Sequence, residues 1–232
     1  MRASSAQGRL LLSTLLLSPG FVPLAAQTTG HDEGHGQSGH AEHAARDGST
    51  LPDGWSARTD GDAGTAEVKV VRMGKGIHVT LGPAIILYRA GASGNGPLHT
   101  LATFTQTRET SHPEGYGLFY GGRALEGAAQ SYTYFLVRGD GSYLIKRRHG
   151  DETSNITEGW VPSPAVHKLN VKGTATNLLE IDHKRDPSKV VFMVNGQPVH
   201  TLDAKATAVD GIVGIRANHH LDLHVDGFDV HR

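Results

Sequence analysis

The stretch SYTYFLVRGDGSYLIKRRH, residues 131–149, contains two alternating apolar runs joined by a short turn. Tyr132 and Tyr134 fall on one face of the first run and Phe135 on the other, because successive side chains of a strand point to opposite faces. The central Gly-Asp-Gly segment tolerates the positive φ angles that hairpin turns require. The stretch therefore predicts an antiparallel β-hairpin with one of its faces in the core.

The same pattern continues on both sides of this hairpin. From residue 51 onward, about a dozen short apolar or alternating runs are separated by Gly, Asp, Asn and Pro, and no helical apolar period is sustained. Asn195-Gly196 marks a second hairpin turn, between VVFMV and QPVHTL. So many short strands predict an all-β fold, a two-sheet antiparallel β-sandwich of the jelly-roll kind.

Composition narrows the class of protein. The formal net charge is -1 over 232 residues, and the chain has no cysteine. Without a basic excess we expect no nucleic-acid partner and no electrostatic attraction to an anionic membrane. Without cysteine, neither a disulfide nor a thiol can contribute to the fold or the chemistry.

The first 26 residues have the pattern of an export signal. Arg2 and Arg9 supply the positive region, and LLLSTLLLSPGFVPL supplies the apolar region. We expect cleavage after Ala26, which would make the mature protein secreted or periplasmic. The apolar run is shorter and more interrupted than the about 20 residues of a spanning helix, so no stable membrane span is expected.

Residues 27–50 are polar and rich in Gly, Ser and His, which predicts a disordered linker before a jelly-roll domain at residues 51–232. Imidazoles beside carboxylates can bind Zn, Cu or Ni without a fold. The spacings of four, five and three residues, however, define no single site in this tract. Its four histidines are His31, His35, His40 and His43.

Near the end of the chain, HHLDLHVDGF alternates apolar and ionisable residues, as in a strand with its apolar side in the core. The expected core residues are Leu221, Leu223 and Val225. The ionisable residues of the other face are His220, Asp222, His224 and Asp226. The two aspartates would lie about 13 Å apart, beyond the roughly 5 to 9.5 Å that separates the two carboxyl groups of a glycosidase.

This face has three interpretations. His220 with Asp222, or Asp222 with His224, could each give two ligands to a divalent metal, which is the cofactor that this pattern suggests. The face could instead line a sugar-binding groove, or simply contact water, as is usual in a sandwich. A third metal ligand would have to come from elsewhere, and the unranked possibilities are His78, His99, His149, Glu109 and Asp151.

The hairpin at residues 131–149 offers a second candidate surface. The rings of Tyr132 and Tyr134 could stack on a sugar, while Arg148 and Asp151 could bind its hydroxyl groups. The alternative is that both tyrosines pack inside the sandwich. Together with His220, Asp222 and His224, these four residues are the substrate-binding candidates.

A family resemblance adds to these observations. The segments GWSARTDG from Gly54, YTYFLVRGDGSYLIKRRHGDET from Tyr132, VVFMVNGQPV from Val190 and GIVGIRANHHLDLHVDGFDV from Gly211 resemble the bacterial 3-keto-disaccharide hydrolase domain family. They also resemble, more distantly, the laminin-G-like and concanavalin-like jelly rolls. The resemblance covers nearly all of residues 54–231, and it implies a jelly roll, an exported location and a carbohydrate-related role.

Two classes of function follow. The protein could be an exported carbohydrate-related protein that binds a glycan or hydrolyses a 3-keto-glycoside. A 3-keto group acidifies the neighbouring C2 hydrogen, so one base and one carbonyl polariser would be enough for cleavage by β-elimination. The alternative is a non-catalytic module that holds a polysaccharide, a protein or a metal at the cell envelope.

Overall fold

The computed structural model describes residues 51–61 and 63–232. The expected export signal and the linker with His31, His35, His40 and His43 lie outside the described residues. Within the described part, no helix is long and apolar enough to cross a bilayer. Its strands are β1 (Ser56–Thr59), β2 (Val68–Met73), β3 (Gly76–Leu81), β4 (Ile85–Gly94), β5 (His99–Gln106), β6 (Gly115–Arg123), β7 (Ser131–Arg138), β8 (Ser142–His149), β9 (Glu152–Asn155), β10 (Val161–Pro162), β11 (Ala175–Asp182), β12 (Lys189–Val194), β13 (Gln197–Asp203), β14 (Gly211–Ala217) and β15 (Asp222–His231), with one 3-10 turn, η1 (Ala204–Ala206).

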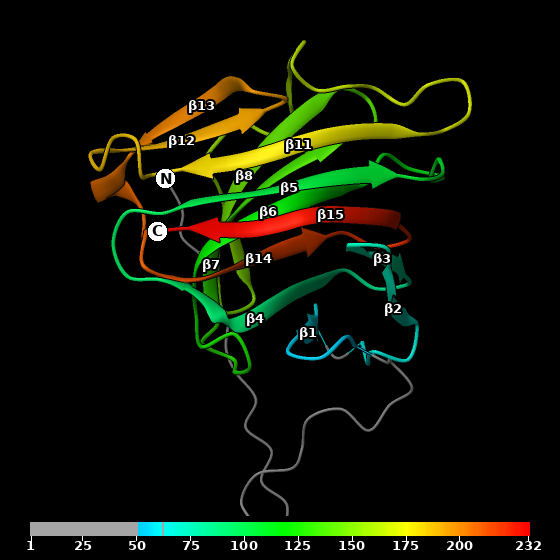
Figure 1. The fold of residues 1–232 in the computed structure, drawn as a ribbon, viewed down its shortest axis with the longest axis horizontal. Helices are drawn as coiled ribbons and strands as arrows, with labels where there is room; N and C mark the ends of the chain where they lie inside the picture. The colour runs from blue at the N-terminus through cyan, green and yellow to red at the C-terminus, as the bar shows by residue number, and fades with distance from the viewer. Residues whose placement is uncertain (1–50, 62) are drawn as a thin grey trace, which may run out of the picture. The chain divides into compact units, whose positions relative to one another are not determined.

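These strands form two antiparallel sheets (Figure 1). The eight-stranded sheet has the order β1-β4-β14-β6-β7-β8-β10, with β9 paired to β8, and the seven-stranded sheet has the order β13-β12-β11-β5-β15-β3-β2. Strands from the end of the chain lie between early strands: β14 between β4 and β6, and β15 between β5 and β3. The predicted two-sheet antiparallel jelly roll is confirmed.

The hairpin that predicts the fold is β7–β8. Tyr132 pairs with Arg148 across it, and Arg138 pairs with Ser142 beside the turn. Gly141 has a φ of 88° in that turn, and the Asp140 carboxylate accepts from the Ser142 backbone N at 3.1 Å. This local chemistry sets the register, and the register brings Tyr132 and Arg148 side by side at the open end of the hairpin.

Both faces of β7 are buried, whereas the sequence predicts one. Phe135 faces the main core between the sheets, where its ring meets Phe192 edge-on at 5.3 Å. Tyr132, Tyr134 and Leu136 face the other way, into a second apolar cluster with Phe119. Loops and neighbouring side chains cover that outer face, which strand alternation alone does not reveal.

The terminal strand β15 is as expected on its apolar side. Leu221 directly before the strand, and Leu223 and Val225 within it, are all buried in the main core. Gly227 has a φ of 62°, and the pairing with β5 shifts register after Asp226. Beyond this irregularity, Phe228 packs on Trp55, with ring centroids 5.5 Å apart.

Candidate functional site

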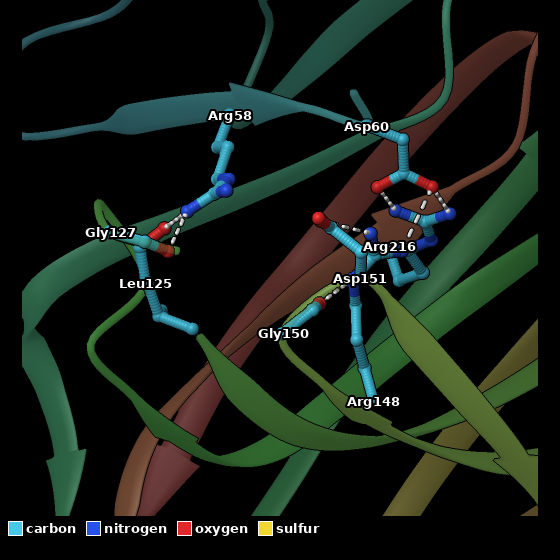
Figure 2. A network of polar contacts seen from close by, with 8 residues as sticks. All are labelled: Arg58, Asp60, Leu125, Gly127, Arg148, Gly150, Asp151 and Arg216. Carbon is cyan, nitrogen blue, oxygen red and sulfur yellow. Dashed lines mark hydrogen bonds and ion pairs between the residues drawn. The ribbon is translucent and has the colours of Figure 1, made fainter. Parts of the chain in front are cut away.

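An ion pair between a buried arginine and a half-buried aspartate lies on the outer face of the eight-stranded sheet. Ile215 and Ala217 of β14 point into the main core, so Arg216 between them points outward. Its Nη1 and Nη2 donate to the two carboxylate oxygens of Asp60 at 2.7 and 2.5 Å (Figure 2). Only 6% of the Arg216 side chain is exposed. The bidentate geometry fixes the segment that follows β1 against the middle of the sheet.

The charges around Asp60 decide its protonation. Burial alone would raise the pKa of Asp60, but the hydrogen bond and charge of Arg216, with the charges of Arg148 and Arg58, outweigh burial and lower it. Burial would likewise lower the pKa of Arg216, and its hydrogen bond to Asp60 reverses this and raises the pKa. Asp60 is therefore a carboxylate at neutral pH and a poor proton donor.

Arg148 lies beside this ion pair. Its Nη1 is 3.3 Å from Asp60 Oδ2, and its Nε donates to the Gly150 carbonyl oxygen at 2.9 Å. Asp151 stands 3.8 Å from Arg148 Nη2, with 89% of its side chain exposed. Asp151 thus lies at the rim of the group, while Arg148 is inside it.

Arg58 reaches the same region from β1 (Figure 2). Its Nη1 donates to the carbonyl oxygens of Leu125 and Gly127 at 2.7 and 2.6 Å. The side-chain oxygen of Gln130, when turned toward the guanidinium groups, accepts from Arg58 Nη2 at 3.2 Å and from Arg148 Nε at 3.1 Å. We call Arg58, Arg148 and Arg216 the arginine cluster; Arg216 and Arg148 contact the carboxylate of Asp60, and the charge of Arg58 acts on it from farther away.

The two tyrosines proposed as stacking platforms lie beneath this cluster. Tyr132 packs on Phe119 with ring centroids 5.1 Å apart, and Arg216 lies over the ring of Tyr134 at 5.7 Å. Both tyrosines are buried, and burial raises the pKa of each hydroxyl. Their rings therefore have the packing role. The buried Tyr132 hydroxyl oxygen has no hydrogen-bond partner.

A cavity of about 180 Å³ lies at the open end of the β7–β8 hairpin. It is lined by Gly121, Ser131, Tyr132, Thr133, Arg147, Arg148, His149 and Ala208. Hydroxyl, guanidinium and imidazole groups supply hydrogen-bond donors on several sides of the cavity. We call this the hairpin cavity. It contains two of the residues predicted from sequence, Tyr132 and Arg148, and lies beside a third, Asp151.

The ionisable residues of the last strand lie on the other sheet and do not gather at one point. Asp222 Oδ1 is 3.0 Å from His78 Nε2, and His224 Nε2 is 2.9 Å from Asp226 Oδ2. His220 precedes the strand in a turn, with a φ of 59°. The sequence predicts that His220 shares a face with Asp222, which requires a strand at both positions. The left-handed backbone of His220 interrupts the strand, so His220 and Asp222 are not neighbours on one strand face.

A metal site is not assembled there. Among residues 51–61 and 63–232, no three His, Cys, Asp or Glu side chains are grouped closely enough to hold an ion. Of the five residues considered as a third ligand, His78 contacts Asp222, whereas His99 pairs with Glu180 at 3.0 Å. The other three lie elsewhere: His149 and Asp151 at the end of the β7–β8 hairpin, and Glu109 in the lining of a separate cavity of about 350 Å³.

Sequence reasoning missed Arg58, Asp60, Gln130 and Arg216. These residues come from three distant parts of the chain, and the fold brings them together. A signal was present at Arg216: it is the one charged residue in the run GIVGIRA. A charge inside an apolar strand is costly without a partner, so it predicts a buried ion pair.

Comparisons with known proteins identify the class of fold. The chain superposes on carbohydrate binding module CBM66 from Bacillus subtilis with a TM-score of 0.56 and 10% identity, covering 80% of this chain and 99% of that one. The carbohydrate recognition domain of Emp46p gives 0.50 and 10%, covering 77% and 88%. A Bacteroides ovatus mixed-linkage glucan GH16 protein gives 0.50 and 11%, covering 78% and 96%.

At these identities the likeness concerns the fold alone, a concanavalin-like jelly roll. No family model matches the chain. A search of curated proteins likewise found no match.

The ion pair gives a prediction for acid stability. The pKa of Asp60 is lower in the folded protein than its ordinary value of 3.8, so its contribution to stability is full above about pH 4 and is lost as pH falls through the lower folded pKa. We expect Asp60→Asn to reduce the free energy of unfolding by about 2 to 4 kcal/mol at pH 7, because it leaves Arg216 buried without its counter-charge. The loss should shrink below pH 4. Urea unfolding from pH 2.5 to 7 measures it.

Asp151→Asn is the matched control, since the same chemical change is made at an exposed carboxylate. It should change the unfolding free energy by less than about 0.5 kcal/mol. Equal effects of the two substitutions would contradict the account of the Asp60–Arg216 pair.

Proposed function

We propose that this protein binds a glycan, with the hairpin cavity as its binding site. The observation that carries the proposal is the donor-rich lining of the cavity, in which Ser131, Thr133, Arg147 and His149 share one face of the β7–β8 hairpin. Sugars present many hydroxyl oxygens in fixed geometry, and a rigid set of donors selects among them. The names of the structural neighbours support this, because they include a carbohydrate binding module and a carbohydrate recognition domain.

The size of the cavity favours a small part of a glycan. At about 180 Å³ it is below the about 300 to 1,000 Å³ that encloses a drug-sized ligand. One sugar unit, or one substituent of it, fits this space better than a long oligosaccharide does. The remaining units of a chain would extend beyond the open end of the hairpin.

Ordinary two-carboxylate hydrolysis has little support at this site. Asp60 is held as a carboxylate by Arg216, so it is a poor general acid near neutral pH. Asp151 is exposed at the rim. For this reason we place binding before hydrolysis.

A second candidate is the cleavage of a 3-keto-glycoside, in line with the resemblance of the sequence to 3-keto-disaccharide hydrolase domains. The observation that favours it is the presence of His149 beside Arg147 and Arg148 in the lining of the cavity. His149 could remove the C2 proton while a guanidinium polarises the ketone. A C1=C2 double bond then forms as the glycosidic C1–O bond breaks, and protonated His149 returns the proton to the departing oxygen, which leaves as an alcohol.

We further propose that the protein acts outside the cytoplasm, secreted or periplasmic, on the pattern of residues 1–26. In that setting a jelly roll on a polar tether would reach extracellular polysaccharide. A protein or metal partner at the cell envelope is the alternative for such a module.

Binding is tested by filling the cavity. Ser131→Tyr adds a ring to its lining, so we expect at least a tenfold loss of affinity for any glycan that the wild-type protein binds on an array, about 1.4 kcal/mol. Ser154→Tyr makes the same change on the exposed strand β9 and should bind as the wild type does. Isothermal titration measures both. Unchanged binding by Ser131→Tyr would reject this site.

Hydrolysis is tested separately with 3-keto-trehalose and with trehalose. If the second candidate is correct, the wild-type protein releases glucose from the keto sugar alone, and His149→Gln lowers the rate by about 100-fold or more, as expected for loss of a general base. His167→Gln, outside the cavity, should keep the rate. No glucose release by the wild type would leave binding as the function.

A further inference from the structure

We infer that a second cavity, at the turn of the β7–β8 hairpin, binds the acetamido group of an N-acetylated sugar. Neither this site nor this ligand group is part of the proposed function; only the choice of a sugar as the carrier of the group rests on it. The ligand is indicated by a buried oxygen atom without a partner at the wall of the cavity, by the balance of charge in the lining, and by the carbon surface beside that oxygen.

We call this space the turn cavity. It has a volume of about 350 Å³, within the about 300 to 1,000 Å³ that encloses a small ligand. Because β7 has eight residues, at about 3.4 Å a residue the turn cavity lies roughly 25 Å from the hairpin cavity at the other end of the strand. The two cavities are therefore separate sites. Three segments line the turn cavity: residues between Gln106 and Pro113, the hairpin turn at Gly139 and Asp140, and Lys168 with Leu169.

The three wall segments are held against one another. The backbone N of Leu169 donates to the Gly139 carbonyl oxygen at 2.9 Å, which ties two of the segments together. Gly173 has a φ of 74°, and a β-carbon there would stand 2.9 Å from the backbone N of Glu109. This glycine therefore lets the loop after Leu169 pack against the third segment. The cavity is formed before a ligand arrives, as is usual for small-molecule sites.

The side chain of Gln106 indicates that the cavity takes a ligand with a hydrogen-bond donor. Gln106 is the last residue of β5 and follows Ala102 and Phe104 on the core side of the strand. Its Nε2 donates to the Arg108 carbonyl oxygen at 2.8 Å, which fixes the orientation of the amide, and its buried Oε1 has no hydrogen-bond partner among the described residues. A β-carbon on Gly139 would stand 3.3 Å from this oxygen. Since Gly139 and Gln106 both line the cavity, Oε1 lies at its wall, where a donor on a ligand would satisfy it.

The charges of the lining cancel, which favours a neutral ligand. Asp140 is already paired, because Arg138 Nε donates to its Oδ2 at 2.7 Å and the Ser142 hydroxyl donates to its Oδ1 at 2.6 Å. The charged groups that remain in the lining are the carboxylate of Glu109 and the ammonium of Lys168. A charged ligand would be attracted by one of them and repelled by the other.

An acetamido group matches these features. A secondary amide has one N–H and one carbonyl oxygen, so it can donate to Gln106 Oε1 and accept from Lys168. Its methyl group would contact Leu169, whose Cγ would stand 2.5 Å from a β-carbon on Gly139 and which therefore lies beside Gln106. A sugar hydroxyl could make the same two hydrogen bonds, but it would not cover the carbon surface of Leu169.

The experiment compares β-1,4-linked glucan oligosaccharides that share a backbone and differ at C2 alone. The C2 group is acetamido in the chitin series, hydroxyl in the cellulose series and ammonium in the chitosan series, and isothermal titration with the whole protein measures each affinity. We expect the acetamido series to bind about tenfold or more tightly than either of the others, because the methyl group fills an apolar part of the cavity. Equal affinity for the acetamido and hydroxyl series, tighter binding of the ammonium series, or no binding of the acetamido series would overturn the inference.

Variants assign the preference to the turn cavity. Ser111→Tyr adds a ring to an exposed part of the lining and should weaken binding of the acetamido series by about tenfold or more, whereas Ser154→Tyr on β9 should leave it unchanged. Lys168→Met keeps the carbon chain and removes the donor for the carbonyl oxygen, so the preference should fall; Lys172→Met, at an exposed position outside the lining, is its matched control. Gln106→Met removes the unpaired oxygen and should abolish the preference, with its folding checked by thermal unfolding.

The outcomes separate the inference from the proposed function. If Ser131→Tyr abolishes binding of the acetamido series while Ser111→Tyr does not, the sugar occupies the hairpin cavity; the proposed function then stands and the inference is overturned. If Ser111→Tyr abolishes binding while Ser131→Tyr does not, the inference stands and the hairpin cavity is not the site for this sugar. If the preference for the acetamido series survives in both Ser111→Tyr and Gln106→Met, the group binds elsewhere and the inference is overturned.

Discussion

The bidentate contact between Arg216 and Asp60 is the interaction on which the candidate site depends. Arg216 stands near the end of β14 with 6% of its side chain exposed, so its charge needs a partner that cannot move away. Asp60 meets that need from the segment after β1, and by accepting from both guanidinium nitrogens it holds β1 and β14 in fixed relation. Arg148 then shares Asp60, and Gln130 links Arg148 to Arg58. A structural ion pair thereby becomes the centre of a cationic group.

Strand alternation explains why this group lies outside the main core. Phe135, Ile215 and their neighbours fill the space between the sheets, so Tyr132, Tyr134 and Arg216 on the same strands must point outward. The β7–β8 register pairs Tyr132 with Arg148 on this outer face. It pairs Thr133 with Arg147 and Ser131 with His149 on the opposite face, and these four side chains line the cavity at the open end of the hairpin. One alternating pattern therefore places the core residues on one face of these strands and the arginine cluster on the other.

The sequence predicts the fold well, because local rules govern it: alternation, the Gly-Asp-Gly turn and the burial of Leu221, Leu223 and Val225 all appear as expected. The site is predicted only in part. Tyr132 and Arg148 lie at the cavity, but Arg58, Asp60 and Arg216 are joined by contacts between distant segments that no local pattern encodes. Alternation assigns His220 to a strand, because the pattern of side chains does not encode a left-handed turn. Alternation also does not show whether the outer face is covered, so it does not decide whether Tyr132 and Tyr134 are packing residues or exposed stacking surfaces.

The central claim is that the hairpin cavity, rather than the outer face of the seven-stranded sheet, is where a glycan binds. A crystal structure of the protein with a bound oligosaccharide tests it most directly. The account predicts sugar density against Ser131 and Thr133, with sugar hydroxyl groups within hydrogen-bond distance of Arg147 or His149. Density for the sugar beside Asp222 and His224, with the hairpin cavity unchanged from the free protein, would contradict it.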